Sequence, residues 1–113
     1  MPDSPEPPLP QASIPRWDSK LVFSKLADPT DRRLLQLLAD GRPHTVTGMA
    51  GTVRRTGDAT LKHLNALCAA HFVHTKPDPV KPRRQLYMLN PAIPVRKTEA
   101  GREIDFGCCT VRC

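Results

Sequence analysis

The stretch TGDATLKHLNALCAA, Thr56 to Ala70, decides the fold. It is the best predicted helix in the chain, and its polar face is suited to contact a partner. Leu61, Leu64 and Leu67 recur at the spacing of one helical face. The first threonine can cap the helix through its hydroxyl, and the helix dipole favours the carboxylate of Asp58 in the first turn. The segment is therefore predicted to be an amphipathic helix with one apolar and one polar face.

A shorter helix is expected immediately upstream, from Val46 to Val53, followed by Arg54 and Arg55. Two short helices joined by a tight turn that contains a glycine, here Gly57, are typical of a helix-turn-helix. In that motif the second helix enters the major groove of DNA. The helix from Thr56 is accordingly the candidate recognition helix.

Two predicted strands follow this helix. Phe72 to Lys76 alternates like a strand, Pro77 to Arg83 is rich in turn residues, and Arg84 to Leu89 reads as a second strand. Helix, strand, basic loop and strand follow one another in this order in a winged helix-turn-helix. The fold class predicted for the chain is therefore α+β and mainly helical, with a β-hairpin wing.

Three segments resemble the ArsR-type winged-helix repressors: LADPTDRRLLQLL (Leu26–Leu38), LKHLNALCAAHFV (Leu61–Val73) and YMLN (Tyr87–Asn90). The usual pattern of that family is L-A-D-P-T-R before a leucine-rich helix, then H-L-x-x-L with a small residue and L-V. The resemblance covers roughly Trp17 to Asn90. It implies a dimeric, DNA-binding transcriptional repressor whose first helix joins the dimer interface.

Two helices are expected before the helix-turn-helix. The first, Arg16 to Ala27, either covers the core or contributes to a dimer interface, and its sequence favours neither. The second begins at Asp28-Pro29, a good cap followed by a proline that loses no hydrogen bond, and stops at Gly41. Arg32 and Arg33 are assigned to its solvated face.

The sequence departs from the family in the turn and at the end of the recognition helix. Arg54-Arg55 stands where the family usually has Gly-Leu in the turn. His71 stands where a glycine commonly closes the recognition helix, so it must either accept a left-handed backbone or change the cap.

Basic residues dominate the predicted recognition helix and wing. The chain has a net charge of +6, and Arg54 to Arg84 contains seven basic residues against two acidic ones, which favours a polyanionic partner such as nucleic acid. Asp58 either caps the helix or accepts a hydrogen bond from a cytosine amino group, and His63 is expected to pack or to contact phosphate. The residues predicted to lie near DNA are Arg54, Arg55, Thr56, Gly57, Asp58, Lys62, His63, Lys81, Arg83 and Arg84.

Other classes of function receive little support. The sequence shows no paired-carboxylate, nucleophile–base or phosphate-loop motif, so we expect no enzyme. No apolar run approaches the roughly 20 residues of a membrane span. The first residues, MPDSPEPPLP, do not show the basic-then-apolar pattern of a signal peptide. We therefore expect a cytoplasmic protein with reduced cysteines, no membrane partner and no required cofactor.

The C-terminal segment departs from the family most. Pro91 and Pro94 exclude the long final helix of the ArsR type, and Val95–Lys97 with Glu103–Phe106 read as an extra β-hairpin in its place. The predicted organisation is a proline-rich, disordered or extended tail (1–15), a winged helix-turn-helix (16–90) and a C-terminal β extension (91–113).

Three of the four cysteines, Cys108, Cys109 and Cys113, lie within the last six residues. Thiolates are soft ligands, so the three could bind arsenite or a soft metal ion, or respond to oxidation. Against this, neighbouring cysteines on a strand would point to opposite faces. The sequence thus predicts a sequence-specific DNA-binding regulator that acts as a homodimeric repressor. A thiol-reactive inducer such as arsenite, or oxidation, would release it from DNA, or it has no inducer. The alternative is a winged-helix protein-interaction module without specific DNA binding.

Overall fold

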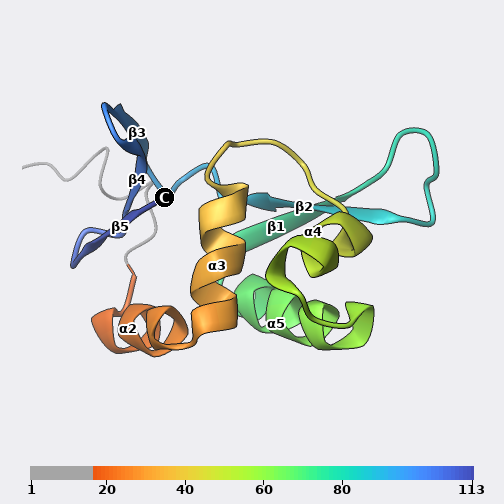
Figure 1. Ribbon diagram of the computed structural model, residues 1–113, viewed down its shortest axis with the longest axis horizontal. Helices are drawn as coiled ribbons and strands as arrows, with labels where there is room; N and C mark the ends of the chain where they lie inside the picture. The colour runs from red at the N-terminus through yellow and green to blue at the C-terminus, as the bar shows by residue number, and fades with distance from the viewer. Residues whose placement is uncertain (1–16) are drawn as a thin grey trace, which may run out of the picture.

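The computed structural model describes residues 17–113, which form four helices, a two-stranded sheet and a three-stranded sheet (Figure 1). The predicted tail and Arg16 lie outside the described residues. The first helix was expected to begin at Arg16, but it begins at Ser19 because Asp18 has an extended backbone and caps it through its side chain. Helices and hairpin follow one another in the predicted winged helix-turn-helix order. The elements are α2 (Ser19–Ala27), α3 (Pro29–Leu38), α4 (Val46–Val53), α5 (Gly57–Ala69), β1 (Val73–Pro77), β2 (Gln85–Leu89), β3 (Val95–Thr98), β4 (Gly101–Asp105) and β5 (Thr110–Arg112).

Asp28 forms the corner between α2 and α3. Its extended backbone ends α2, and its Oδ1 accepts hydrogen bonds from the N–H groups of Thr30 (2.8 Å) and Asp31 (3.1 Å). Pro29 takes the first helical position, where a missing N–H costs nothing. The predicted start of α3 is confirmed, and the physical reason is a local cap that needs no tertiary contact.

The buried face of α5 is rotated from the predicted one. Thr60, Leu64 and Leu67 are fully buried, whereas Leu61, which was expected to share one apolar face with Leu64 and Leu67, is 37% exposed. Residues 60, 64 and 67 also share one helical face, and packing against α3 and the hairpin selects this face. The selection places the Thr60 hydroxyl in the core, where it has no hydrogen-bond partner among the described residues.

The wing strands β1 and β2 pair antiparallel from Val73 opposite Leu89 to Pro77 opposite Gln85. Tyr87 also exchanges two backbone hydrogen bonds of 2.8 Å with His44, which extends this sheet by one bridge. Side chains alternate across the strands, and Val73 and Leu89 face the core.

His71 stands at the end of α5, where the sequence allowed either a left-handed backbone or a different cap. It adopts the left-handed conformation (φ 67°), so the chain turns there although the residue is not glycine. Its N–H donates to the Cys68 carbonyl (2.9 Å), and its own carbonyl accepts from Asn90 Nδ2 (2.7 Å). These two bonds stabilise the turn between α5 and β1.

The C-terminal extension is a three-stranded antiparallel sheet in the order β3-β4-β5. The predicted hairpin is present as β3 and β4, but the third strand, β5, was not predicted. Phe106 reaches the winged-helix core, with its ring centroid 5.3 Å from that of Phe72, and Gln36 Nε2 donates to the Arg112 carbonyl at 2.9 Å. The extension therefore shares one hydrophobic core with the helices.

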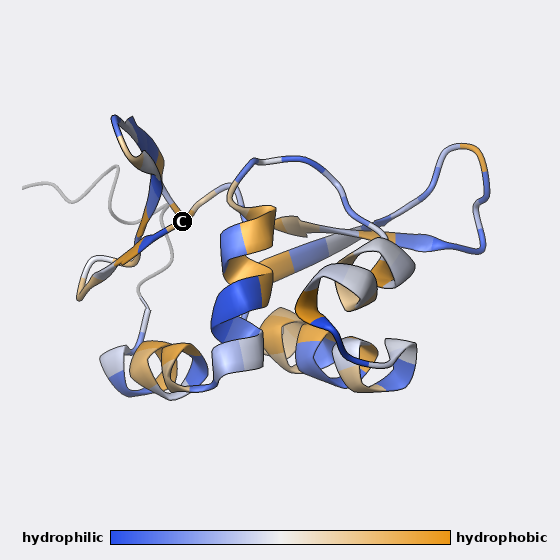
Figure 2. Ribbon diagram, viewed as in Figure 1, coloured by the Kyte–Doolittle hydropathy of each residue, from blue (hydrophilic) through white to orange (hydrophobic). Residues whose placement is uncertain are grey.

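The wing loop and the C-terminal sheet lie at opposite ends of the molecule (Figure 1). Figure 2 shows that the wing loop is mostly hydrophilic and that α3 and α5 each contain both hydrophobic and hydrophilic segments. No helix follows β2 in the part of the chain that the structure describes. None of the described helices has the length and hydropathy needed to cross a membrane.

Candidate nucleic-acid interface

Arg54, Arg55 and Thr56 form the turn of the helix-turn-helix. Arg54 ends α4 in the left-handed conformation (φ 57°, ψ 47°), and the N–H groups of Arg54 and Arg55 both donate to the Ala50 carbonyl. Glycine adopts this conformation freely, whereas other residues lose about 1–2 kcal/mol in it. The turn thus keeps the shape that a glycine would favour while presenting an arginine.

The start of α5 is capped by Thr56, as predicted. Its Oγ1 accepts a hydrogen bond from the Ala59 N–H (3.1 Å), and α5 begins at Gly57. Asp58 lies exposed in the first turn, where its charge interacts favourably with the helix dipole. Because Thr56 supplies the cap, the carboxylate of Asp58 is available to a partner.

One exposed stripe runs along α5. It consists of Asp58, Leu61, Lys62 and Asn65, all exposed to solvent and three or four residues apart. Leu61 belongs to this stripe and not to the core, so the candidate reading surface contains one acidic, one apolar, one basic and one amide side chain. The sequence pattern missed Leu61 because leucine at helical spacing usually indicates the core.

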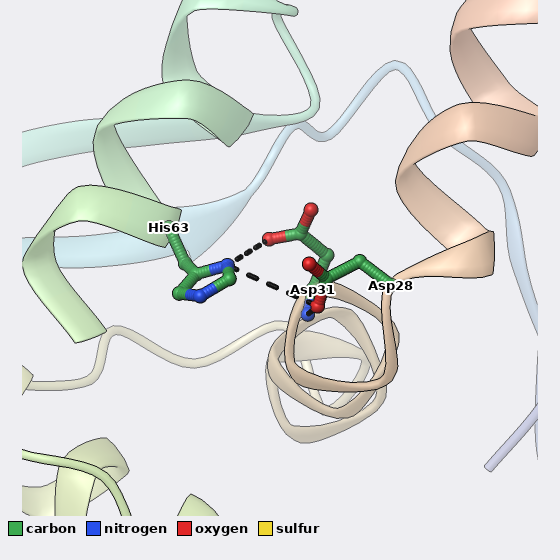
Figure 3. Close-up of side chains that lie close together, drawn as sticks. All are labelled: Asp28, Asp31 and His63. Carbon is green, nitrogen blue, oxygen red and sulfur yellow. Dashed lines mark hydrogen bonds and ion pairs between the residues drawn. The ribbon is translucent and has the colours of Figure 1, made fainter. Parts of the chain in front are cut away.

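His63 was expected near DNA, and the structure places it against α3. Its Nδ1 lies 2.8 Å from Asp31 Oδ1 and 4.0 Å from Asp28 Oδ1 (Figure 3). The side chain of Asp31 is only 7% accessible, and that of His63 is 29% accessible. The contact joins the middle of α5 to the first turn of α3, so His63 packs in the fold, which is one of the two roles expected for it.

Asp28, Asp31 and His63 offer three ligand atoms within 4.8 Å of one another, a spacing that a metal ion could use. Each group already has a protein partner, however. Burial pushes the pKa of Asp28 upward, but the N–H groups of Asp31 and Thr30 and the charges of His63 and Arg55 outweigh it and hold that pKa below its usual value. The cap and the α3–α5 contact account for all three side chains without an ion.

Asp78 and Arg84 hold the wing in one conformation. The guanidinium of Arg84 donates to Asp78 Oδ2 through Nε (2.8 Å) and a terminal nitrogen, while Asp78 Oδ1 accepts from the Val80 N–H (2.9 Å). That N–H and the guanidinium of Arg84 hold the pKa of Asp78 below its usual range. This pair was not predicted, and it gives Arg84 a structural role beside the expected contact with phosphate.

The other predicted wing cations are free of such pairing. Lys81 and Arg83 are exposed, and neither forms an ion pair with any described residue. Val80 directly precedes Lys81 in the wing loop and is 83% exposed. The wing thus offers two cations and one apolar side chain on a loop that three prolines and the Asp78–Arg84 pair stiffen.

The tail cysteines are not gathered into one site. Among the described residues, Asp28, Asp31 and His63 form the one group with metal-ligand spacing, so the three C-terminal thiols do not share a point in a single chain. Burial raises the pKa of the Cys109 thiol, helped by the neighbouring Cys108, and burial also raises the pKa of Cys113. A raised pKa keeps a thiol protonated and less reactive toward metals and oxidants.

No protein-family model matches the chain, and no curated protein sequence matches it. Solved structures do. NolR from Sinorhizobium fredii is 26% identical over 79% of this chain and 80% of that chain, with a TM-score of 0.55. The S. aureus MepR–DNA complex is 19% identical over 66% and 64%, with a TM-score of 0.56.

A third similar structure is a homodimeric winged helix-turn-helix DNA-binding domain from Mycobacterium bovis, described as a possible ArsR-family transcriptional regulator. It is 24% identical over 64% of this chain and 63% of that chain, with a TM-score of 0.54. The chain spans about half to two thirds of the length of the first structures that it matches. It is therefore a winged helix-turn-helix protein, with the fold of ArsR-type and related transcription regulators.

Proposed function

We propose that this chain is a sequence-specific, double-stranded DNA-binding transcriptional regulator that acts as a homodimeric repressor. The observation that carries the proposal is a set of exposed cations on the turn, α5 and the wing. None of them forms an ion pair with another described residue. The set consists of Arg54, Arg55, Lys62, Lys76, Lys81 and Arg83.

The arrangement suits a DNA duplex. The wing and the α4–α5 pair lie at the end of the molecule remote from the C-terminal sheet (Figure 1). In this proposal α5 enters the major groove, where Asp58 can accept from a cytosine amino group and Leu61 can contact a thymine methyl group. The cations of the turn and wing contact phosphates, which fix the register without reading sequence.

A homodimer is the second part of the proposal. Phe23 on α2 is 52% exposed, although large aromatic side chains stabilise a fold mainly when they are buried. Leu21 on the same helix is half-buried. An α2–α2 contact would cover Phe23, and the similar domain from M. bovis is itself described as homodimeric.

Release by a thiol-reactive inducer is the third part. Arsenite or a soft metal would need thiols from Cys108, Cys109 and Cys113, and although Cys108 lies against Cys109, the three thiols do not meet at one point within one chain. The raised pKa values of Cys109 and Cys113 also disfavour the thiolate form that binds metals. Binding would require the tail to rearrange, or thiols from a second copy to complete the site.

Leu61 also favours a second candidate function. An apolar side chain beside Asp58 on the exposed face of α5 suits a protein partner as well as a thymine. A winged-helix interaction module would use this face without specific DNA binding. The two functions differ in their salt dependence, because phosphate contacts release counterions.

The deciding experiment measures binding of the full chain to a labelled fragment of its own upstream DNA and to random duplex DNA of equal length. Salt is varied between about 50 and 200 mM, a range over which phosphate-dominated binding falls steeply. Specific binding supports the regulator, and its loss on adding arsenite supports the inducer. Failure to shift either DNA at low salt would reject the regulator in favour of the interaction module.

A further inference from the structure

A groove of about 550 Å³ lies between α3 and the turn of the helix-turn-helix. Four of its nine lining residues are arginines, Arg32 and Arg33 from α3 and Arg54 and Arg55 from the turn. The remaining residues are uncharged, so no carboxylate lines the groove. Four guanidinium groups around one groove repel one another, and an anion between them would relieve that repulsion.

The nearest acidic residues form no ion pair with these arginines, although the charge of Arg55 helps to lower the pKa of Asp28. None of the four forms an ion pair with another described residue. Asp28 accepts the N–H groups that start α3, and Asp31 is held by His63. Arg32 uses one terminal nitrogen to donate to the Leu26 carbonyl (2.8 Å), which orients the side chain while leaving its charge uncompensated.

The backbone of Arg54 is a second, independent observation. A left-handed residue that is not glycine is uncommon, and residues in strained conformations are enriched at ligand-binding and switch regions. Glycine at this position would remove the conformational cost, yet it would also remove a cation from the edge of the groove. A contact between the Arg54 side chain and an anion in the groove would offset this cost.

We propose that this groove is a clamp for phosphates of the DNA backbone, next to the segment that α5 reads. Planar guanidinium groups bind phosphate oxygens through paired N–H donors, and a set of four can hold adjacent phosphates. The proposal rests on the proposed DNA-binding function and extends it to α3. Arg32 and Arg33, which the sequence placed on a solvated face, become part of the DNA-contact surface.

The test compares two double variants of the full chain in the same salt titration. Arg32→Gln/Arg33→Gln removes two charges from the groove. Lys97→Gln/Arg102→Gln removes two exposed charges from the C-terminal sheet, neither of which is ion-paired with another described residue. Each lost phosphate contact should make the slope of log K against log salt shallower by about 0.9. We expect this change for the groove variant alone, with equal weakening on specific and random DNA.

Arg54→Gly provides a second test of the groove, and this substitution removes a groove cation without removing side-chain packing from the core. Because glycine relaxes the turn, we expect an unchanged or higher Tm together with weaker binding to both DNAs. Thermal unfolding also shows whether the groove variant is folded.

Three outcomes overturn the proposal. In the first, the groove variant and the control variant have the same salt slope. In the second, Arg54→Gly binds DNA like the wild type. In the third, inorganic pyrophosphate raises the Tm of the wild type but not of the groove variant while the DNA slope stays unchanged, which would assign the groove to a soluble phosphate compound. If the wild type binds no DNA at all, the proposed function itself fails, which is a distinguishable result.

Discussion

Replacing His63 by alanine should destabilise the protein and loosen its recognition helix. His63 Nδ1 lies 2.8 Å from Asp31 Oδ1, and the carboxylate that it contacts is only 7% accessible. The substitution leaves a buried acidic group without its hydrogen-bond partner. The contact joins α5 to α3 through two residues that are 32 positions apart in the sequence.

The expected magnitude follows from that burial. A hydrogen bond to a charged group contributes about 1.5–3 kcal/mol, so we expect His63→Ala to lower the free energy of unfolding by about 2 kcal/mol. For a domain of this size such a loss lowers the Tm by about 10 °C. His74→Ala is the matched control, because His74 is exposed on β1 and has no side-chain hydrogen bond to another described residue. It should change stability by less than about 0.5 kcal/mol.

The assay is a double-mutant cycle of His63→Ala and Asp31→Ala, measured by urea unfolding at pH 7. Two side chains in direct contact should show a coupling energy of at least about 1 kcal/mol. A coupling energy near zero, or a His63→Ala variant as stable as His74→Ala, would refute the view that this pair holds α5 on α3. DNA binding measured in parallel would show whether the helix must be held to read its target.

Four further predictions concern the proposed interface and the stability of the fold. Lys62→Ala should weaken binding to all DNA sequences and make the salt slope shallower by about 0.9; an unchanged slope would remove Lys62 from the contact surface. Arg84→Ala should increase hydrogen exchange throughout the wing because Asp78 loses its partner, and unchanged protection would count against that role. Phe23→Ser should shift the protein from dimer to monomer in analytical ultracentrifugation, whereas an intact dimer would exclude the α2 contact. The folded state holds the pKa of Asp78 below the usual 3.8, so ionised Asp78 contributes stability above about pH 4, and this contribution is lost as the pH falls through the folded pKa. Asp78→Asn should therefore make stability depend less on pH in the acid range. An acid range identical to that of the wild type would contradict this prediction.

Much of the fold could be predicted because its signals are local. The side chains of Asp28 and Thr56 accept hydrogen bonds from backbone N–H groups two or three residues later, and each thereby starts a helix. Pro29 fits the first helical position because no hydrogen bond is needed there. Pro91 and Pro94 likewise exclude a helix wherever the rest of the chain lies. The resemblance to ArsR-type proteins then placed these elements in their correct order.

The candidate site was less predictable, because exposure depends on how each helix is rotated in the core. Leu61 has the helical spacing of the buried residues Leu64 and Leu67. The structure nevertheless buries Thr60 and leaves Leu61 exposed on the candidate reading surface. The third C-terminal strand, β5, was also missed, since three residues carry too little periodicity to identify a strand.

The sequence by itself determined the order of the helices and the wing, the caps that start α3 and α5, and that the turn and wing are basic. These properties follow from caps, prolines and charge, which act within a few residues. Only the tertiary structure decided that His63 binds Asp31, that Asp78 holds Arg84, and that arginines of α3 and of the turn line one groove. Such pairings depend on distances between folded elements, and neither residue type nor spacing along the chain specifies those distances.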